Sequence, residues 1–224
     1  MQVGLSVELI SFTPDPESLV AEAARLCYKK EGMSLTSGAR NLNEDAKLLE
    51  DLFKAGHLSP FEHASFTFYV EGVSRALSHQ LVRHRIASYT QRSQRYIKED
   101  NFDYVVPEYI DKDPELKNIF IDSMEYAQEK YKHLISLGVK PEDARFVLPN
   151  ACATKLIITM NARALFNFFK ERLCKRAQWE IRNLAEEMYN LVYNVAPNIF
   201  KFAGPDCKLG DCKQGSRSCK KEGK

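Results

Sequence analysis

The sequence reads ASFTFYV over residues 64–70, and this is the clearest strand pattern in the chain. Apolar and more polar side chains alternate along it, with Ala64, Phe66, Phe68 and Val70 on one face and Ser65, Thr67 and Tyr69 on the other. A period of two is typical of a strand that buries one face. The stretch therefore predicts one strand of a sheet. The sequence segments on either side of it indicate which elements pack on this strand.

Helices are predicted on both sides of this strand. Residues 43–56, which Gly56 ends, and residues 73–84 both have helical spacing of their apolar side chains. Further out, strands are predicted at 3–10 and 152–160, helices at 16–30, 114–138, 141–148 and 161–195 with a break near Cys174, and a long polar loop at 86–102. A few strands among several helices indicate an α/β or α+β domain.

The charge of the chain is almost balanced. Its 224 residues include 32 Lys and Arg against 30 Asp and Glu, which gives a formal net charge of +2. Residues 204–224 carry six basic and three acidic residues, so residues 1–203 have a net charge near −1. Such a balance argues against a dedicated nucleic-acid-binding protein, and an apolar share of 44% argues against a disordered chain.

The sequence also predicts where the protein works. The first residues, MQVGLSVELISF, lack the basic start, apolar core and cleavage site of a secretory signal. No run of about 18 apolar residues is present, so no membrane partner is expected. We therefore predict a cytoplasmic protein.

Three of the six cysteines lie close together near the C-terminus, at Cys207, Cys212 and Cys219. Their gaps of four and six residues, without a CxxC pair or a nearby histidine, are unlike the usual zinc spacings. The sequence therefore predicts no metal site and a basic, flexible, cysteine-containing tail at residues 204–224. Cys27, Cys152 and Cys174 are expected to be reduced, packed thiols.

Common catalytic motifs are missing from the sequence. It has no GxG pair for a dinucleotide-binding turn or P-loop, no HExxH and no GxSxG. The usual nucleotide-binding enzymes, zinc proteases and serine hydrolases are therefore not indicated.

The most unusual stretch is RHRIASYTQRSQRY, residues 83–96. Its four arginines fall within 13 residues and are interleaved with hydroxyl side chains and two tyrosines. Arginine forks bind phosphate in a bidentate way, so the cluster indicates a site for a small, highly anionic ligand. Two alternatives remain open: a solvated basic loop, or a non-catalytic RNA- or nucleotide-binding protein in which arginine and tyrosine contact bases.

Several motifs in this order resemble those of the flavin-dependent thymidylate synthases, the ThyX family. Arg83-His84-Arg85 is followed, after seven intervening residues, by Ser93, with Arg95 and Tyr96 after it. Residues 57–63 (HLSPFEH), His79-Gln80 and residues 161–181 (NARALFNFFKERLCKRAQWEI) resemble further segments of the family. The resemblance extends over roughly residues 5–200, within a predicted synthase domain at residues 1–203.

The resemblance implies an enzyme that methylates dUMP to dTMP. The one-carbon donor would be 5,10-methylenetetrahydrofolate, and FAD reduced by NADPH would be the hydride source, without a cysteine nucleophile. It also implies a single domain with a small, mostly antiparallel sheet flanked by helices. The protein would be a homotetramer with active sites at subunit interfaces and no nucleic-acid partner.

Site residues follow from the resemblance position by position. FAD would contact His57, Ser59, Arg83, His84, Arg85, Ile86, Gln91, Asn161, Ala162, Arg163 and Asn167. The dUMP site would contain Gln80, Arg83, Gln91, Arg92, Ser93, Gln94, Arg95, Arg145 and Arg172. Arg172 would be the catalytic group, because a guanidinium at the uracil edge stabilises negative charge there. Ser93 is expected to bind phosphate rather than act as a nucleophile, since no His or Asp is evidently poised to activate it.

Overall fold

Four strands form one sheet in the order β1-β2-β4-β3 in the computed structural model, which describes residues 1–27, 42–210 and 212–219. The strands are β1 (Ser6–Phe12), β2 (Ser65–Ser74), β3 (Ser88–Gln91) and β4 (Ala153–Asn161). β1 and β2 are antiparallel, because Thr13 N donates to Ser65 O at one end and Gly72 approaches Gly4 at the other. β2 and β4 are also antiparallel, since Ala162 pairs with Ala64 and Arg75 with Cys152.

The strand predicted from residues 64–70 is confirmed as the centre of β2, where Phe66, Phe68 and Val70 are fully buried. Gly72 in this strand has φ +69, and a Cβ there would lie 1.8 Å from the carbonyl oxygen of Gly4. Only glycine allows this approach of the two backbones. β4 is confirmed, whereas β1 begins at Ser6 rather than at residue 3.

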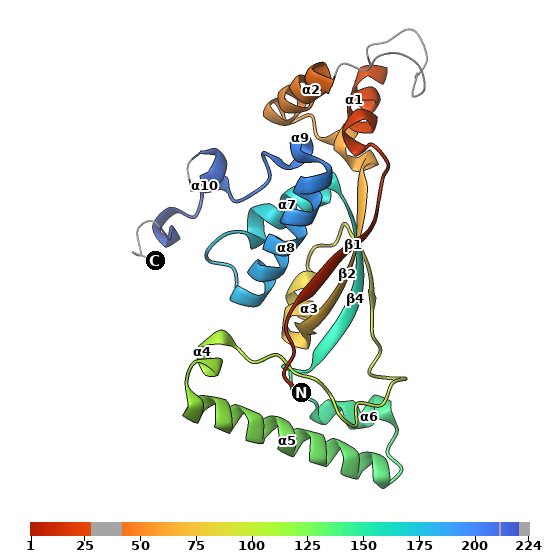
Figure 1. Cartoon of the computed structure of the whole chain (residues 1–224), viewed down its shortest axis with the longest axis vertical. Coiled ribbons are helices and arrows are strands. Elements are labelled where there is room, and N and C mark those ends of the chain that lie inside the picture. The colour runs from red at the N-terminus through yellow and green to blue at the C-terminus, as the bar shows by residue number, and fades with distance from the viewer. Residues whose placement is uncertain (28–41, 211, 220–224) are drawn as a thin grey trace. The chain divides into compact units, whose positions relative to one another are not determined.

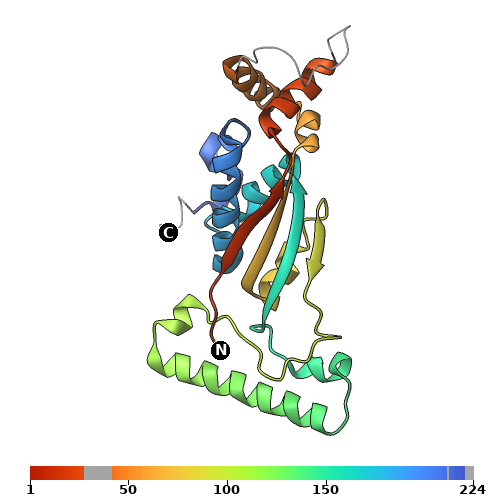
Figure 2. The same ribbon diagram turned by 45° about the vertical axis from the view of Figure 1, so that its right-hand side comes forward.

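The prediction of a continuous loop over residues 86–102 is wrong at its start. Residues Ser88–Gln91 form β3, which lies beside β4 (Figure 2). Only four residues pair, and both faces are polar or half-buried. Such a short edge strand has no hydrophobic alternation from which to recognise it.

The chain divides into two compact units, each assembled from separate segments. The first contains Met1–Ser6, Tyr69–Arg83 and Tyr89–Ile157; the second contains the described residues within Val7–Phe68, His84–Ser88 and Ile158–Lys224. The strands β1, β2, β3 and β4 contribute residues to both. Mixed helices with a small antiparallel sheet confirm the predicted fold class.

The first unit contains the helices α3 (Arg75–Leu81), α4 (Glu108–Asp111), α5 (Pro114–Ser136) and α6 (Pro141–Ala144), and the 3-10 turn η2 (Arg145–Val147). α5 begins where Asp113 accepts hydrogen bonds from the backbone N–H groups of Glu115 and Leu116. It contacts α4, α6 and η2 (Figure 1). Its apolar face packs on a small core that includes Phe102, Met124 and Cys152.

The second unit contains α1 (Pro16–Leu26), α2 (Leu42–Ala55), η1 (Ser59–His63), α7 (Ala162–Arg172), α8 (Trp179–Val195), α9 (Pro197–Phe200), α10 (Asp206–Leu209) and η3 (Gly215–Arg217). Phenylalanine rings join several of these elements. The Phe166 ring meets those of Phe53, Phe61 and Phe200 edge-on at centroid distances of 5.2, 5.3 and 5.8 Å. These rings fix α7, which carries several predicted site residues, against α2, η1 and α9.

The predicted break near Cys174 is confirmed, because α7 ends at Arg172 and α8 begins at Trp179. The predicted helix end near residue 30 lies outside the described residues, and α1 ends at Leu26. Among the helices that the structure describes, none is both long and apolar enough to cross a bilayer.

We expected residues 204–224 to form a flexible, solvated tail. Its described part belongs to the second unit and contacts other elements of that unit at several points. Asp206 pairs with Lys170 at 3.0 Å, and Arg176 Nη1 donates to the carbonyl oxygen of Arg217 at 2.6 Å. Ser218 is 5% exposed. The described residues of this segment therefore pack on other elements of the second unit, and the flexibility of the tail stays a prediction.

Candidate functional site

A cavity of about 380 Å³ in the first unit collects several polar side chains. Arg75 at the start of α3, Arg145 in η2 and Gln94 from the loop after β3 line it. Gln94 is 8% exposed, although the sequence around it is polar. We call this space the arginine cavity. It brings together two of the predicted dUMP residues, Gln94 and Arg145.

The two arginines of this cavity repel each other. Burial lowers the pKa of Arg75, and the nearby charge of Arg145 lowers it further. The Nε atom of Arg145 donates to the carbonyl oxygen of Glu142 at 3.0 Å, which orients its guanidinium. Two guanidinium groups held close together are stabilised when an anion binds between them. The cavity therefore has the charge and the donors required by a phosphate group.

Arg75 was not among the residues predicted from the sequence. It precedes the Arg83–Tyr96 segment, and Arg145 lies 70 residues further along the chain. One signal in the sequence could have identified Arg75. It lies in the predicted helix, one turn before His79-Gln80. That position places it on the same side of the helix as residues of the motif.

The other polar residues of the β3 region point to different partners. Gln91 Nε2 donates to Thr154 Oγ1 at 3.2 Å, and Ser93 Oγ accepts from the backbone N–H of Arg95 at 3.1 Å. Arg95 Nε donates to Glu142 at 2.6 Å. Arg95 thus contacts the Glu142 carboxylate and Arg145 the Glu142 backbone carbonyl, so Glu142 holds the loop beside the arginine cavity.

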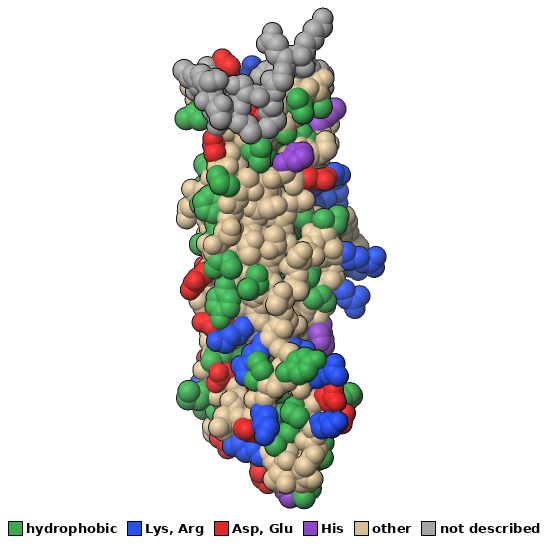
Figure 3. All heavy atoms as spheres, turned by 90° about the vertical axis from the view of Figure 1, so that its right-hand side faces the viewer, with side chains coloured by type: hydrophobic (Ala, Val, Ile, Leu, Met, Phe, Trp, Pro, Cys, Tyr) green, Lys and Arg blue, Asp and Glu red, His purple; other side chains and the backbone are tan. Residues whose placement is uncertain are grey.

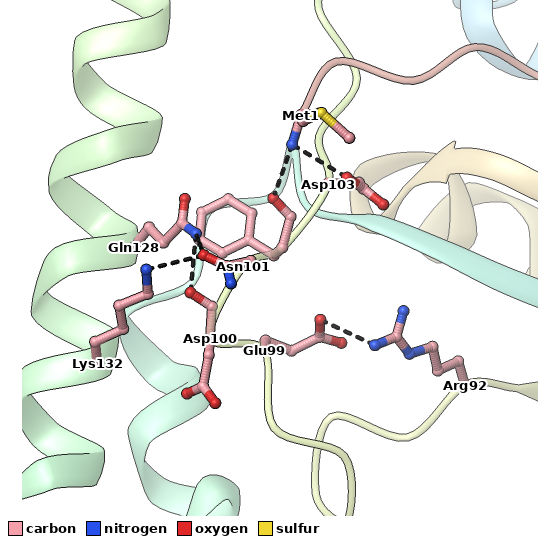
Figure 4. A network of polar contacts seen from close by, with 9 residues as sticks. Met1, Arg92, Glu99, Asp100, Asn101, Asp103, Gln128 and Lys132 are labelled. Atoms are coloured by element: carbon pink, nitrogen blue, oxygen red, sulfur yellow. Dashed lines mark hydrogen bonds and ion pairs between the residues drawn. The ribbon is translucent and has the colours of Figure 1, made fainter.

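Arg92 lines a neighbouring space in the first unit and pairs with Glu99 at 3.3 Å (Figure 4). The loop that contains Glu99 is fixed on α5. Gln128 donates to the Asp100 carbonyl and to Asn101 Oδ1, both at 2.8 Å, and Lys132 donates to Asn101 at 2.9 Å. The Glu99–Arg92 pair is therefore anchored from the helix side.

Glu99 is 5% exposed. Desolvation raises its pKa, while the charges of Arg92 and Arg75 act in the opposite direction and Asp103 adds to the rise. Between the unfolded pKa and this raised folded pKa, the folded state binds a proton that the unfolded state has lost. Stability therefore falls as pH rises through this window, and ionised Glu99 costs stability at neutral pH.

We expect the Glu99→Gln variant to unfold at a higher temperature than the native protein at about pH 8, and at a similar temperature at about pH 4. The expected rise is on the order of 2–4 °C for each kcal/mol of desolvation cost removed. Thermal unfolding at both pH values measures it. Glu125→Gln, on the exposed side of α5, is the matched control and should change neither value. A lower midpoint for Glu99→Gln at about pH 8 would show that the Arg92 pair outweighs desolvation.

In the second unit, Arg172 contacts His84. The Nε atom of Arg172 donates to His84 Nε2 at 2.9 Å, and the imidazole packs edge-on against Phe168 at 5.0 Å. Burial lowers the pKa of His84, and the charge of Arg172 lowers it further, while Glu171 opposes this. A ring nitrogen that accepts a hydrogen bond carries no proton, so the 4.0 Å contact of His84 with Glu171 is not an ion pair. His84 is therefore neutral and orients the Arg172 guanidinium.

Two of the predicted FAD residues of α7 lie around another cavity of about 370 Å³ in the second unit. Arg163 and Asn167 line it together with Lys170 and the rings of Phe53, Phe166 and Phe202. Arg163 also pairs with Glu62 in η1. Cationic side chains beside aromatic walls suit a ligand with both phosphates and flat rings.

The remaining predicted residues have simpler positions. Asn161 caps α7 by accepting from the backbone N–H of Ala164 at 2.8 Å, and Ala162 is fully buried behind it. Gln80 is half-buried in α3. The exposed positions are His57, Ser59, Arg83, Arg85 and Ile86. These residues stay predictions for ligand contact.

On the side shown in Figure 3, Lys and Arg side chains are interspersed with Asp and Glu. This agrees with a locally concentrated anion site in a chain of balanced charge.

Known proteins resemble this chain over almost its whole length. Residues 8–198 match the family model described as thymidylate synthase complementing protein. A flavin-dependent thymidylate synthase of Clostridium tetani is 52% identical, over 98% of this chain and 94% of that protein. A flavin-dependent thymidylate synthase of Pyrococcus furiosus is 45% identical, over 92% of this chain and 88% of that protein.

A solved structure has the same fold. The crystal structure of PolB, a UMP/dUMP methylase from Streptomyces cacaoi bound with 5-Br dUMP, superposes with a TM-score of 0.81. Its sequence is 26% identical, and the match covers 89% of this chain and 94% of that one. The fold described above is therefore that of a protein which holds a uridine nucleotide.

Proposed function

The chain belongs to the flavin-dependent thymidylate synthase family, and from this membership we propose that it methylates dUMP to dTMP. The one-carbon donor is 5,10-methylenetetrahydrofolate, and FAD reduced by NADPH is the hydride source. The observation that carries the proposal in this structure is the arginine cavity. It offers two guanidinium groups and a buried amide to a small anion in a chain of balanced charge.

In this proposal the arginine cavity holds the phosphate of dUMP. Arg75 and Arg145 supply forked donors, and Gln94 supplies an amide that discriminates orientation. Arg75 and Arg145 repel each other in the free protein, and the bound phosphate would relieve this repulsion. Relief of the repulsion would therefore contribute to the binding free energy of dUMP.

Arg172 has the catalytic role in our proposal. Negative charge on N3 and the carbonyl oxygens of uracil activates the ring carbon that receives the one-carbon unit. A guanidinium fixed at the uracil edge stabilises that charge, and His84 fixes it by accepting from Nε.

The residues of the second unit fit FAD. Arg163 and Lys170 supply cations for its diphosphate, and Phe53, Phe166 and Phe202 supply apolar walls for a ring system. FAD, when bound and reduced, supplies the hydride that converts the attached one-carbon unit into a methyl group. The chain itself contributes binding, orientation and exclusion of water from these aromatic walls.

The state of Cys152, the cysteine nearest in sequence to Arg145, supports a mechanism without a cysteine nucleophile. Cys152 is fully buried, and burial raises the pKa of its thiol to about 12. Such a thiol stays protonated at neutral pH and is a poor nucleophile. Activation of the pyrimidine then depends on Arg172.

A homotetramer with shared active sites is also part of the proposal. Phe146 and Tyr96 are 83% and 77% exposed, and they adjoin Arg145 and Arg95 in sequence. Large exposed rings next to site residues indicate a surface that another subunit covers. The molar mass in solution, measured by light scattering, should equal four chains. A monomer would contradict this part.

The alternative of a non-catalytic RNA- or nucleotide-binding protein is not favoured, because the relatives that match almost the whole chain are enzymes. The cytoplasmic location and the lack of a nucleic-acid partner stay predictions from the sequence.

The visible spectrum tests the proposed cofactor directly. Purified protein should be yellow, with flavin absorbance and one FAD per chain after reconstitution, and dUMP should perturb that spectrum. Protein that stays colourless after incubation with FAD would overturn the proposal. Denatured protein carried through the same steps controls for free flavin.

A further inference from the structure

Three cysteines from different segments of the chain line one cavity of about 240 Å³ in the second unit. Cys174 comes from the break between α7 and α8, Cys207 from α10, and Cys212 from the segment after it. All three are half-buried and reduced. We call this space the thiol cavity. Of the residues assigned above to ligand binding or catalysis, Lys170 and Arg172 also line it, and its three thiols have no role in the proposed reaction.

The charge around the thiol cavity is positive. Lys170, Arg172, Arg176 and Lys213 line it against two carboxylates, those of Glu171 and Asp206. Lys170 already pairs with Asp206 at 3.0 Å. A cavity with this excess of cations attracts small anions and raises their local concentration.

Contacts between the tail and the rest of the second unit hold the cavity in shape. Arg176 Nη1 donates to the carbonyl oxygen of Arg217 at 2.6 Å, and Lys208 Nζ donates to that of Ala203 at 2.8 Å. These bonds keep Cys207 and Cys212 on the same cavity as Cys174. Among the described residues, no three His, Cys, Asp or Glu side chains form a group able to hold a metal ion.

We propose that the thiol cavity is a modification site for low-molecular-weight disulfides that carry carboxylates. The cations attract the carboxylates, and the sulfur of one cavity cysteine attacks the disulfide. A sulfur–sulfur bond forms to the protein as the bond of the small disulfide breaks, and one small thiol leaves with the proton from the cysteine. A second cavity cysteine then attacks the sulfur of the first cysteine, and the second small thiol leaves with the proton from the attacking cysteine. The two cysteines end as an intrachain disulfide, and the small disulfide ends as two thiols.

The reaction has a consequence for the proposed active site. Arg172 belongs both to the thiol cavity and to the contact with His84. A disulfide that includes Cys174 joins the segment directly after Arg172 to the tail. This link restrains the position of the arginine and makes it dependent on the thiol state.

The test is the rate at which each cysteine of the full-length, FAD-loaded protein reacts with oxidised glutathione, measured by mass spectrometry of peptides after trapping of free thiols. We expect Cys174, Cys207 and Cys212 to react at least about tenfold faster than exposed Cys27, and the mapped product to be a disulfide between two of the three. Buried Cys152 should stay unmodified.

Two controls separate charge attraction from simple exposure. Hydroxyethyl disulfide, which is uncharged, should show little preference for the thiol cavity over Cys27. Lys213→Gln should slow the reaction with oxidised glutathione, whereas Lys175→Gln, which does not line the cavity, should not. Equal rates at the cavity and at Cys27, or zinc bound to the purified protein in proportion to these cysteines, would overturn the proposal. Neither result depends on whether dUMP is methylated.

Discussion

Replacing Arg172 by alanine is expected to lower kcat for dTMP formation on the order of 10²–10³-fold, while FAD remains bound. The reason is that the guanidinium stabilises charge that develops on uracil during the reaction, so its loss affects the transition state more than the ground state. Two of the residues that we expect to hold FAD, Arg163 and Asn167, line a different cavity. The flavin spectrum should therefore be unchanged.

The kinetic experiment measures kcat at saturating dUMP together with FAD content and the thermal midpoint. The midpoint matters because His84 loses the donor from Arg172, and loss of a buried hydrogen bond costs about 1–3 kcal/mol. Lys175→Ala, three residues further along, is the matched control and should keep full activity. Arg172→Lys, which keeps the charge but not the fork, should give an intermediate rate. Full turnover by the alanine variant would remove Arg172 from the chemistry.

Replacing Arg145 by alanine is expected to raise KM for dUMP roughly 10- to 100-fold with a smaller change in kcat. A hydrogen bond to a charged group contributes about 1.5–3 kcal/mol, and every 1.4 kcal/mol is about a factor of ten in affinity. The phosphate is distant from the reacting carbon, so its contact stabilises substrate and transition state equally. Arg75→Ala should have an effect of similar size, because both arginines line the same cavity.

The phosphate itself provides the control for Arg145. Binding of deoxyuridine, which lacks the phosphate, should be the same for the native protein and for Arg145→Ala. The advantage of dUMP over deoxyuridine should shrink in the variant by the same factor as its affinity for dUMP. Lys140→Ala, an exposed cation near the start of α6, is the matched control variant. An equal loss of affinity for dUMP and for deoxyuridine would show that Arg145 does not contact the phosphate.

The strands and helices with strong periodicity were predictable from the sequence. The alternation in residues 64–70 gave β2, and Gly56, which has φ +76, follows the last residue of α2 as predicted. β3 was missed because its four residues have no apolar face. Asp113 and Pro114 marked the start of α5, since an N-cap followed by proline is a local signal that needs no tertiary contact.

The candidate site was predictable in composition but not in arrangement. The resemblance to the family identified Gln94 and Arg145 but could not show that Arg75 shares a cavity with them, because that depends on how α3 and η2 pack. Likewise, the spacing of Cys207 and Cys212 gave no reason to connect them with Cys174. The contact of His84 with Arg172 joins residues 88 positions apart. Such long-range pairs follow from tertiary structure and leave no local pattern.

The central claim is that this chain makes dTMP from dUMP with FAD. The most direct measurement is product analysis by mass spectrometry after the FAD-loaded protein is incubated with dUMP, 5,10-methylenetetrahydrofolate and NADPH. We predict dTMP in proportion to NADPH oxidised, and none when FAD or the folate is left out. Recovery of unchanged dUMP from protein that carries FAD and oxidises NADPH would contradict the account.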